Sequence, residues 1–230
     1  MKRVDPIRNL DLFYEMQQQM MLDGKIKECL LLILMFNTNL RVSDALLIKW
    51  RDVIDSDDGS IVNNLVISER KTKKNKWLPI TKQLKTALLN YYVKYNPKLS
   101  DFIFRSISNR IQGRNQSWTR QYVCSTFKRY AKKVGIKDNI GSHSPRKTWG
   151  YHAYRSGMLK EEIKRILNHS DSRQTEIYCG IDDDLTRDNY EFVSRLNKRA
   201  DNLIRKENLP DEYRSIRPAY KRRKKKKRAV

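Results

Sequence analysis

The amino-acid sequence predicts a mainly α-helical fold with one small antiparallel β-sheet, the α+β class. Apolar residues recur at helical spacing over most of the chain, as in the stretch LDLFYEMQQQM at 10–20. Two short apolar segments, 61–68 and 76–80, instead flank a polar turn, which is typical of a β-hairpin. A hydrophobic fraction of 39% over 230 residues is enough to build one core.

The first three expected helices are delimited by capping residues and helix breakers. Asp5 followed by Pro6 is typical of an N-cap with proline at the first helical position. Asp23-Gly24 ends that helix at about Leu22. Two further helices are expected over about 25–37, which is mostly apolar, and about 42–50.

The middle of the chain contains the strands. A turn at 56–59 lies between short strand candidates at 52–54, 61–68 and 76–80, and the last two form a hairpin whose tip is ERKTKKN. Thr81 caps a helix that ends before Pro97, and DFIF at 101–104 is a short apolar segment.

The second half is again helical. Ser117 caps a helix that runs to about Lys133 and is ended by Gly135. The remaining expected helices cover 143–156, 159–168, 172–179 and about 185–206. From Pro210 the periodicity is lost, so we expect one domain over 1–209 and a basic flexible tail over 210–230.

The net charge predicts a polyanionic partner. The formal charge is +23, and the ten Lys and Arg from Arg214 onward account for only part of it, because removing them leaves +13. Lys and Arg gain affinity for phosphates by releasing counterions. The expected domain is therefore basic in its own right.

The cysteines and the apolar segments favour a cytosolic protein. Cys29, Cys124 and Cys179 are odd in number and show no metal-binding spacing, which is typical of a reduced compartment. The apolar run at 29–36 is much shorter than the roughly 20 residues of a membrane span. The N-terminus lacks the apolar stretch of a secretory signal.

Two clusters of charged residues are candidates for phosphate contacts. Arg41 and Asp44 lie three residues apart in TNLRVSDALLIKW and can meet across one helical turn. The two residues either form only a surface ion pair, or Asp44 holds the Arg41 guanidinium so that it faces a phosphate. The lysines of the hairpin tip are either solvated or reach into a DNA groove, and one could serve as a proton donor; they are Lys71, Lys73, Lys74 and Lys76.

Two further segments contain the histidines of interest. In HSPRKTWGYHAYRSG, His143 and Arg146 share one face of a helix start, which Ser142 or Ser144 can cap. A helix N-terminus, an arginine and a histidine together make an anion site, although an isolated pair of this kind is more often structural. In LNHSDSRQTEIYCGI, His169 follows a helix end at Asn168, and Tyr178 comes nine residues later.

Taken in order, these residues resemble the tyrosine recombinase family, the phage integrase type. Its pattern is Arg, a hairpin Lys, His-x-x-Arg, His or Trp, and Tyr, and the resemblance covers about Leu10 to Leu196. TNLRVSDALLIKW resembles the first arginine box with its acidic position, and KTKKNKWLPI resembles the lysine hairpin. The intervals from His143 to His169 and from His169 to Tyr178 match the usual ones.

The sequence departs from the family pattern at a few positions. Asn39 and Asn168 stand where the family usually has glycine, and asparagine tolerates the positive φ that such positions require. Pro145 and Lys147 replace the usual leucine and histidine. Many members have a separate N-terminal core-binding domain, and because Arg41 comes early in this sequence we expect none here.

The resemblance implies a reaction and roles for the residues. Arg41 and Arg146 would contact the non-bridging oxygens of a DNA phosphodiester, with hydrogen bonds from His143 and His169. Tyr178 would attack the phosphorus to give a 3′-phosphotyrosyl link, Lys71 would protonate the leaving 5′ oxygen, and Asp44 would orient Arg41. No metal or other cofactor is expected, because the link conserves the phosphoester bond energy.

The resemblance also implies partners. Double-stranded DNA would be bound by a homotetramer on two sites, with a monomer or weak oligomer in its absence, and an accessory DNA-bending or clamp protein would assist. The apolar pattern at 189–196 fits docking into a neighbouring subunit or packing on its own domain. We expect a cytoplasmic, nucleoid-associated protein of bacterial, phage or mobile-element origin. Further phosphate contacts are expected from the tail, at Lys221, Arg222, Arg223 and Lys224.

Three hypotheses about the function follow. The first is an active site-specific recombinase that integrates, excises or inverts a DNA element. The second is a non-catalytic DNA-binding protein derived from the same fold, although such a protein has no need of Tyr178. The third is a type IB topoisomerase, which would relax supercoiled DNA at no specific site.

Overall fold

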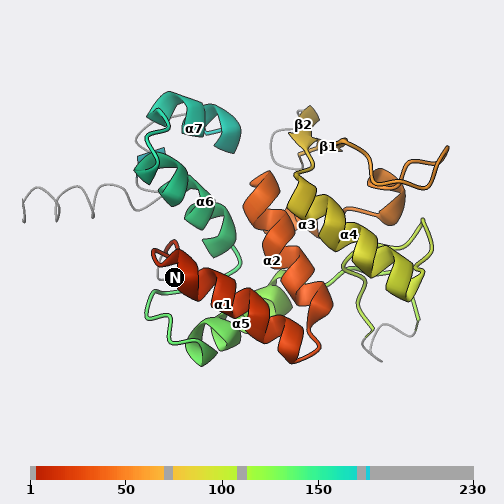
Figure 1. Ribbon diagram of the computed structural model, residues 1–230, viewed down its shortest axis with the longest axis horizontal. Helices are drawn as coiled ribbons and strands as arrows, with labels where there is room; N and C mark the ends of the chain where they lie inside the picture. Colours follow the sequence, from red (N-terminus) through yellow and green to blue (C-terminus); the bar gives the residue numbers. More distant parts are fainter. Residues whose placement is uncertain (1–3, 70–74, 108–112, 170–174, 177–230) are drawn as a thin grey trace, which may run out of the picture. The chain divides into compact units, whose positions relative to one another are not determined.

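The chain folds into helices with one two-stranded sheet, so the predicted α+β class is confirmed (Figure 1). A computed structural model describes residues 4–69, 75–107, 113–169 and 175–176. In chain order the elements are α1 (Leu10–Leu22), α2 (Ile26–Thr38), α3 (Val42–Ala45), the 3-10 turn η1 (Trp50–Asp52), β1 (Asn64–Ser68), β2 (Asn75–Pro79), α4 (Lys82–Tyr95), α5 (Arg120–Lys133), α6 (Ser144–Arg155) and α7 (Lys160–Leu167).

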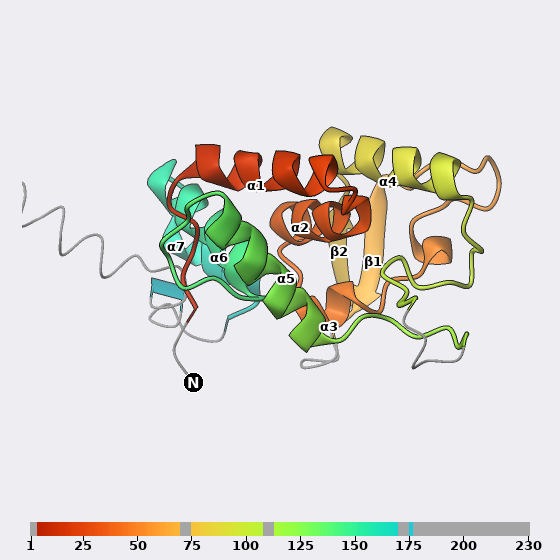
Figure 2. The same cartoon turned by 90° about the horizontal axis from the view of Figure 1, so that it is seen from below.

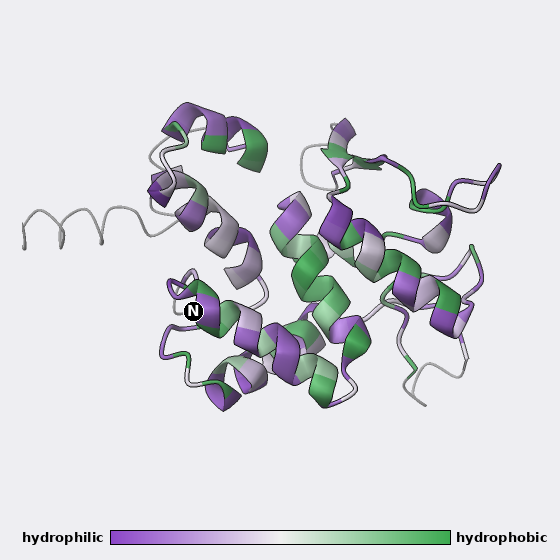
Figure 3. Ribbon diagram, viewed as in Figure 1, coloured by the Kyte–Doolittle hydropathy of each residue, from purple (hydrophilic) through white to green (hydrophobic). Residues whose placement is uncertain are grey.

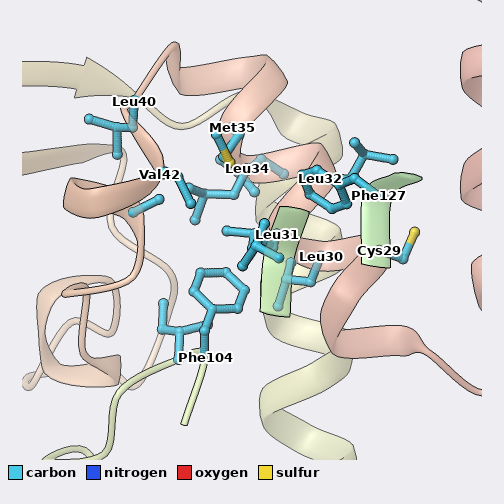
Figure 4. Close-up of a cluster of buried hydrophobic side chains, with 14 of the residues drawn as sticks. Cys29, Leu30, Leu31, Leu32, Leu34, Met35, Leu40, Val42, Phe104 and Phe127 are labelled. Atoms are coloured by element: carbon cyan, nitrogen blue, oxygen red, sulfur yellow. The ribbon is translucent and has the colours of Figure 1, made fainter. Parts of the chain in front are cut away.

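Helix α2 forms the centre of the hydrophobic core. It is apolar on nearly all sides (Figure 3), and it contacts α1, α3, α4 and α6. Helices α1 and α4 both lie along the same side of α2 (Figure 2). Its buried leucines gather with Leu40, Val42, Phe104 and Phe127 from other elements (Figure 4). Each such side chain contributes about 1.5–3 kcal/mol when fully buried, so α2 is a rigid base for the residues that follow it.

The predicted hairpin is present with a defined register. Strands β1 and β2 pair antiparallel, with Leu65 opposite Leu78 on the buried face and Val66 opposite Trp77 on the exposed face. The expected strand over 61–68 is shorter at its start, because Ile61 makes only an isolated bridge with Ile54. The buried leucine pair fixes the register, since a shift by one residue would expose it.

The predicted N-caps of the first helix and of α5 are wrong. The first helix begins at Leu10, where the Asn9 side chain accepts hydrogen bonds from the backbone of Asp11 and Leu12. The segment around Asp5 is not helical, because Asp5 N donates to Asn139 O at 2.9 Å and tertiary contacts replace the helical ones. Helix α5 is capped by Thr119 rather than Ser117.

The other helices in the described ranges follow the prediction with some changes of length. Thr81 caps α4 as predicted, accepting from Leu84 N at 3.3 Å. The helix expected over 42–50 ends at Ala45, because the backbone of Trp50 turns to bond with Asp101 O at 3.1 Å. Helices α6 and α7 confirm the expected helices at 143–156 and 159–168.

Much of the C-terminal part lies outside the described residues. This applies to the expected helix at 172–179, of which only 175–176 are described, as helical, and to the expected helix at about 185–206 and the tail. Within the described ranges, no helix is both long and apolar enough to span a bilayer.

Candidate active site

Four of the predicted catalytic residues lie at the ends of three helices. Arg41 precedes α3, His143 and Arg146 are at the start of α6, and His169 follows α7. Eight further predicted site residues lie outside the described part of the chain; they are Lys71, Lys73, Lys74, Tyr178, Lys221, Arg222, Arg223 and Lys224. Their roles stay predictions.

Arg41 is held by a carboxylate from the hairpin. Helix α2 ends at Asn39, whose φ of 55° confirms the predicted left-handed conformation and turns the chain toward Arg41. The Arg41 Nη1 atom donates to Glu69 Oε2 at 2.9 Å, and the Glu69 side chain is fully buried. The predicted partner, Asp44, is also buried near the N-terminus of α3. Its orienting role stays a prediction, and the carboxylate found on Arg41 is Glu69.

Arg146 joins the ends of two helices. Its side chain is only 1% exposed, and its two terminal nitrogens donate to Asn39 O at the end of α2 and to Leu167 O at the end of α7. These carbonyls carry the partial negative charge of helix C-termini, which a guanidinium stabilises. Because each terminal nitrogen carries two N–H groups, such bonds are compatible with donation to a phosphate.

His169 is placed by the turn that ends α7. Asn168 adopts the predicted left-handed conformation, with φ of 51°, and His169 N donates to Lys164 O at 3.0 Å. The Asn168 side chain donates to Glu69 Oε2 at 2.8 Å. The His169 ring lies 3.1 Å from Thr175 Oγ1, measured from Nδ1. Glu69 thus contacts both Arg41 itself and Asn168, the residue that precedes His169.

Lys76 belongs to this cluster. Its Nζ atom donates to Ile166 O at 2.7 Å. Burial, with further repulsion from Arg146, lowers the pKa of Lys76 to about 8. The sequence grouped Lys76 with the lysines of the hairpin tip as a DNA contact. The structure places it on β2 against the last turn of α7, and a DNA contact by Lys76 stays a prediction.

His143 occupies the N-cap position of α6 without a side-chain capping bond, so the predicted serine cap is wrong. Ser144 instead accepts from Gly141 N at 3.0 Å. Burial lowers the pKa of His143 to about 4, with repulsion from Arg120, Arg146, Lys147 and Arg41 acting in the same direction. The imidazole is therefore neutral at pH 7 and carries one N–H donor.

His143→Gln is expected to reduce the loss of stability in acid. The unfolded chain takes up a proton at His143 near pH 6.5, whereas the folded protein does so only near pH 4. The free energy of unfolding therefore rises with pH between 4 and 6.5, by up to about 3 kcal/mol for this group. Denaturant titrations at several pH values without DNA should give a shallower slope for the variant. Parallel curves would contradict the assignment.

Sequence reasoning missed two residues of this cluster. The sequence predicted Glu69 only as part of the hairpin tip, and it predicted Asn168 only as the residue that ends a helix. A glutamate directly after a predicted strand, in a chain rich in arginine, was the available signal.

A large groove elsewhere in the molecule is separate from this cluster. It has a volume of about 1360 Å³ and lies between α1, α2 and α4, where Met21, Leu30, Ile33 and Tyr91 contribute to its walls. None of the predicted site residues within the described ranges lines it.

Comparison with known proteins agrees with this arrangement. Residues 12–184 match the model of the phage integrase family. The chain is 33% identical over 193 residues to the "Probable integrase/recombinase YoeC" of Bacillus subtilis (strain 168), covering 84% of this chain and 98% of that protein. It is 25% identical over 162 residues to the tyrosine recombinase XerD of Listeria innocua, covering 68% of this chain and 50% of XerD, about half its length.

Solved structures show the same fold. The crystal structure of XerA recombinase superimposes with a TM-score of 0.61 at 18% identity, covering 83% of this chain and 66% of that one. XerH recombinase bound to its palindromic difH substrate gives a TM-score of 0.61 at 16% identity, covering 84% and 54%. With a family match over most of its length and a relative matched along nearly its whole length, the chain belongs to the phage integrase family of tyrosine recombinases.

Proposed function

We propose that this protein is a site-specific DNA recombinase, which cuts and rejoins DNA through a 3′-phosphotyrosyl intermediate. The observation that carries the proposal is the gathering of Arg41, His143, Arg146 and His169 from the ends of three helices, α3, α6 and α7. Membership of the family and the similarity to YoeC along nearly its whole length support it.

The proposed chemistry needs no group beyond the side chains. Arg41 and Arg146 bind the scissile phosphate and stabilise the charge that builds up in the transition state. His143, neutral in the protein without DNA, donates its N–H to a phosphate oxygen, and His169 donates a second. The Tyr178 oxygen loses its proton to solvent and bonds to phosphorus, while the bond from phosphorus to the 5′ oxygen breaks. Lys71 gives that oxygen a proton.

The proposed partner is double-stranded DNA. Two of the similar structures, XerH and lambda integrase, are described as bound to DNA sites. A charge of +23 favours the same partner here. We further propose assembly as a homotetramer on two DNA sites, action in a bacterial nucleoid, and help from an accessory DNA-bending or clamp protein.

The proposal is tested by trapping the covalent intermediate. The full chain is incubated with nicked duplexes drawn from its own genomic neighbourhood, so that the cleaved end diffuses away and rejoining fails. A DNA-linked band on a denaturing gel supports the proposal. Tight, salt-sensitive binding without any band on any duplex would favour a non-catalytic DNA-binding protein, and relaxation of plasmids lacking a site would favour a topoisomerase.

Lys71→Ala is expected to slow strand cleavage by about 10²-fold or more, because the leaving 5′ oxygen loses its proton donor. A duplex with sulfur in place of that bridging oxygen should restore most of the rate, since a thiolate leaves without protonation. Single-turnover cleavage of both duplexes measures this. The matched control is Lys85→Ala on α4, which should behave like the wild type with either duplex. An equal loss on both duplexes would contradict the role of Lys71.

A further inference from the structure

Glu69 is the most completely buried charged group near the site. Its side chain has no exposed surface, and it lies directly after β1, two residues before Lys71. A buried carboxylate is costly unless donors compensate it. Within the described ranges, its Oε2 atom accepts from Arg41 Nη1 at 2.9 Å and from Asn168 Nδ2 at 2.8 Å.

The two donors come from elements that are far apart in the sequence. Arg41 follows the end of α2, and Asn168 is the left-handed residue that ends α7 and directly precedes His169. Glu69 itself belongs to the hairpin. One carboxylate oxygen therefore ties together the hairpin, the first arginine and the turn that places the second histidine.

We propose that Glu69 is a positioning residue for DNA cleavage, which fixes the Arg41 guanidinium and the His169 turn relative to the scissile phosphate. This inference rests on the proposed recombinase function. Glu69 does not contact the reacting atoms in this account. It acts by restricting Arg41 to one orientation, so that the bidentate geometry is present before DNA arrives.

The direction in which the cleavage rate changes when Glu69 is neutralised separates a positioning role from a purely electrostatic one. A negative charge beside an anion-binding arginine weakens phosphate binding by charge repulsion. If Glu69 acted only in that way, its neutralisation would leave cleavage unchanged or raise it. If Glu69 positions Arg41 and the turn, neutralisation lowers the cleavage rate while DNA affinity stays the same or increases.

The test uses Glu69→Gln, which keeps the shape of the side chain and one acceptor oxygen but loses the charge. Single-turnover cleavage of the nicked duplex at saturating protein should fall about tenfold or more, because hydrogen bonds to a charged group are the stronger ones. The dissociation constant for the same DNA should not increase. The matched control is Glu28→Gln on α2, a buried carboxylate that accepts from Tyr122, which should cleave at the wild-type rate.

A double-mutant cycle adds a readout that general destabilisation does not move. In an Arg41→Lys background, Glu69→Gln should lower the cleavage rate much less than in the wild type, because the guanidinium that Glu69 orients is already absent. Glu69→Asp, which keeps the charge but withdraws the oxygen by one carbon–carbon bond, should also cleave slowly. It provides the same comparison if Glu69→Gln does not fold at the assay temperature.

The outcomes distinguish a failure of the proposed recombinase function from a failure of the positioning role of Glu69. If the wild type forms no covalent link, the proposed function fails and this inference falls with it. If the wild type cleaves and both Glu69 variants cleave at its rate, only the positioning role is overturned. Independent, additive losses in the cycle would also overturn it, because positioning through Arg41 requires coupling.

Discussion

Tyr178→Phe is expected to abolish the covalent DNA link. Phenylalanine keeps the ring but lacks the oxygen that attacks phosphorus, so no other group completes the first step. We expect the DNA-linked band to fall by at least about 10³-fold, to the background of the gel. DNA affinity, measured by gel shift, should stay within a factor of about two, because binding depends on the arginines and lysines.

The control for this substitution is Tyr190→Phe, which removes another tyrosine hydroxyl from the same C-terminal part of the sequence. It should form the link at the wild-type rate. A Tyr178→Phe protein that still forms the link, or a Tyr190→Phe protein that does not, would show that Tyr178 is misassigned as the nucleophile.

Arg146→Lys is expected to cause the second-largest loss, in both activity and stability. The guanidinium spans Asn39 O and Leu167 O, and a single ammonium group cannot reach both carbonyls while also pairing with a phosphate. We expect cleavage to fall about 10³-fold. The free energy of unfolding should fall by about 2 kcal/mol, because a buried carbonyl loses its charged donor.

Arg155→Lys provides the comparison, because Arg155 lies at the exposed end of the same helix. This variant should match the wild type in single-turnover cleavage and in urea unfolding. Cleavage by Arg146→Lys at a rate close to the wild type would mean that the arginine is structural and that the phosphate is held elsewhere.

Features that depend on local sequence were predictable. The left-handed turns at Asn39 and Asn168 follow from the φ tolerance of asparagine, and both are present. The hairpin and the Thr81 cap likewise depend on residues close together in the chain. His143, Arg146 and His169 were nominated in a different way, because their order and spacing resemble the family pattern.

Features that depend on long-range contacts were not predictable in the same way. Asn9 replaces Asp5 as a cap because the segment around Asp5 bonds to Asn139, which is distant in the sequence. Asp44 was named as the partner of Arg41 because it lies one helical turn away. Glu69 makes the ion pair because the hairpin folds back onto the end of α2. Periodicity and spacing do not report such contacts.

The most direct test of the account is to identify the amino acid that is joined to DNA. The trapped complex is digested with nuclease and trypsin, and the modified peptide is sequenced by mass spectrometry. The account predicts a 3′-nucleotide on the tryptic peptide 174–187, QTEIYCGIDDDLTR, whose single tyrosine is Tyr178. A nucleotide on another peptide, or one attached through its 5′ phosphate, would contradict it.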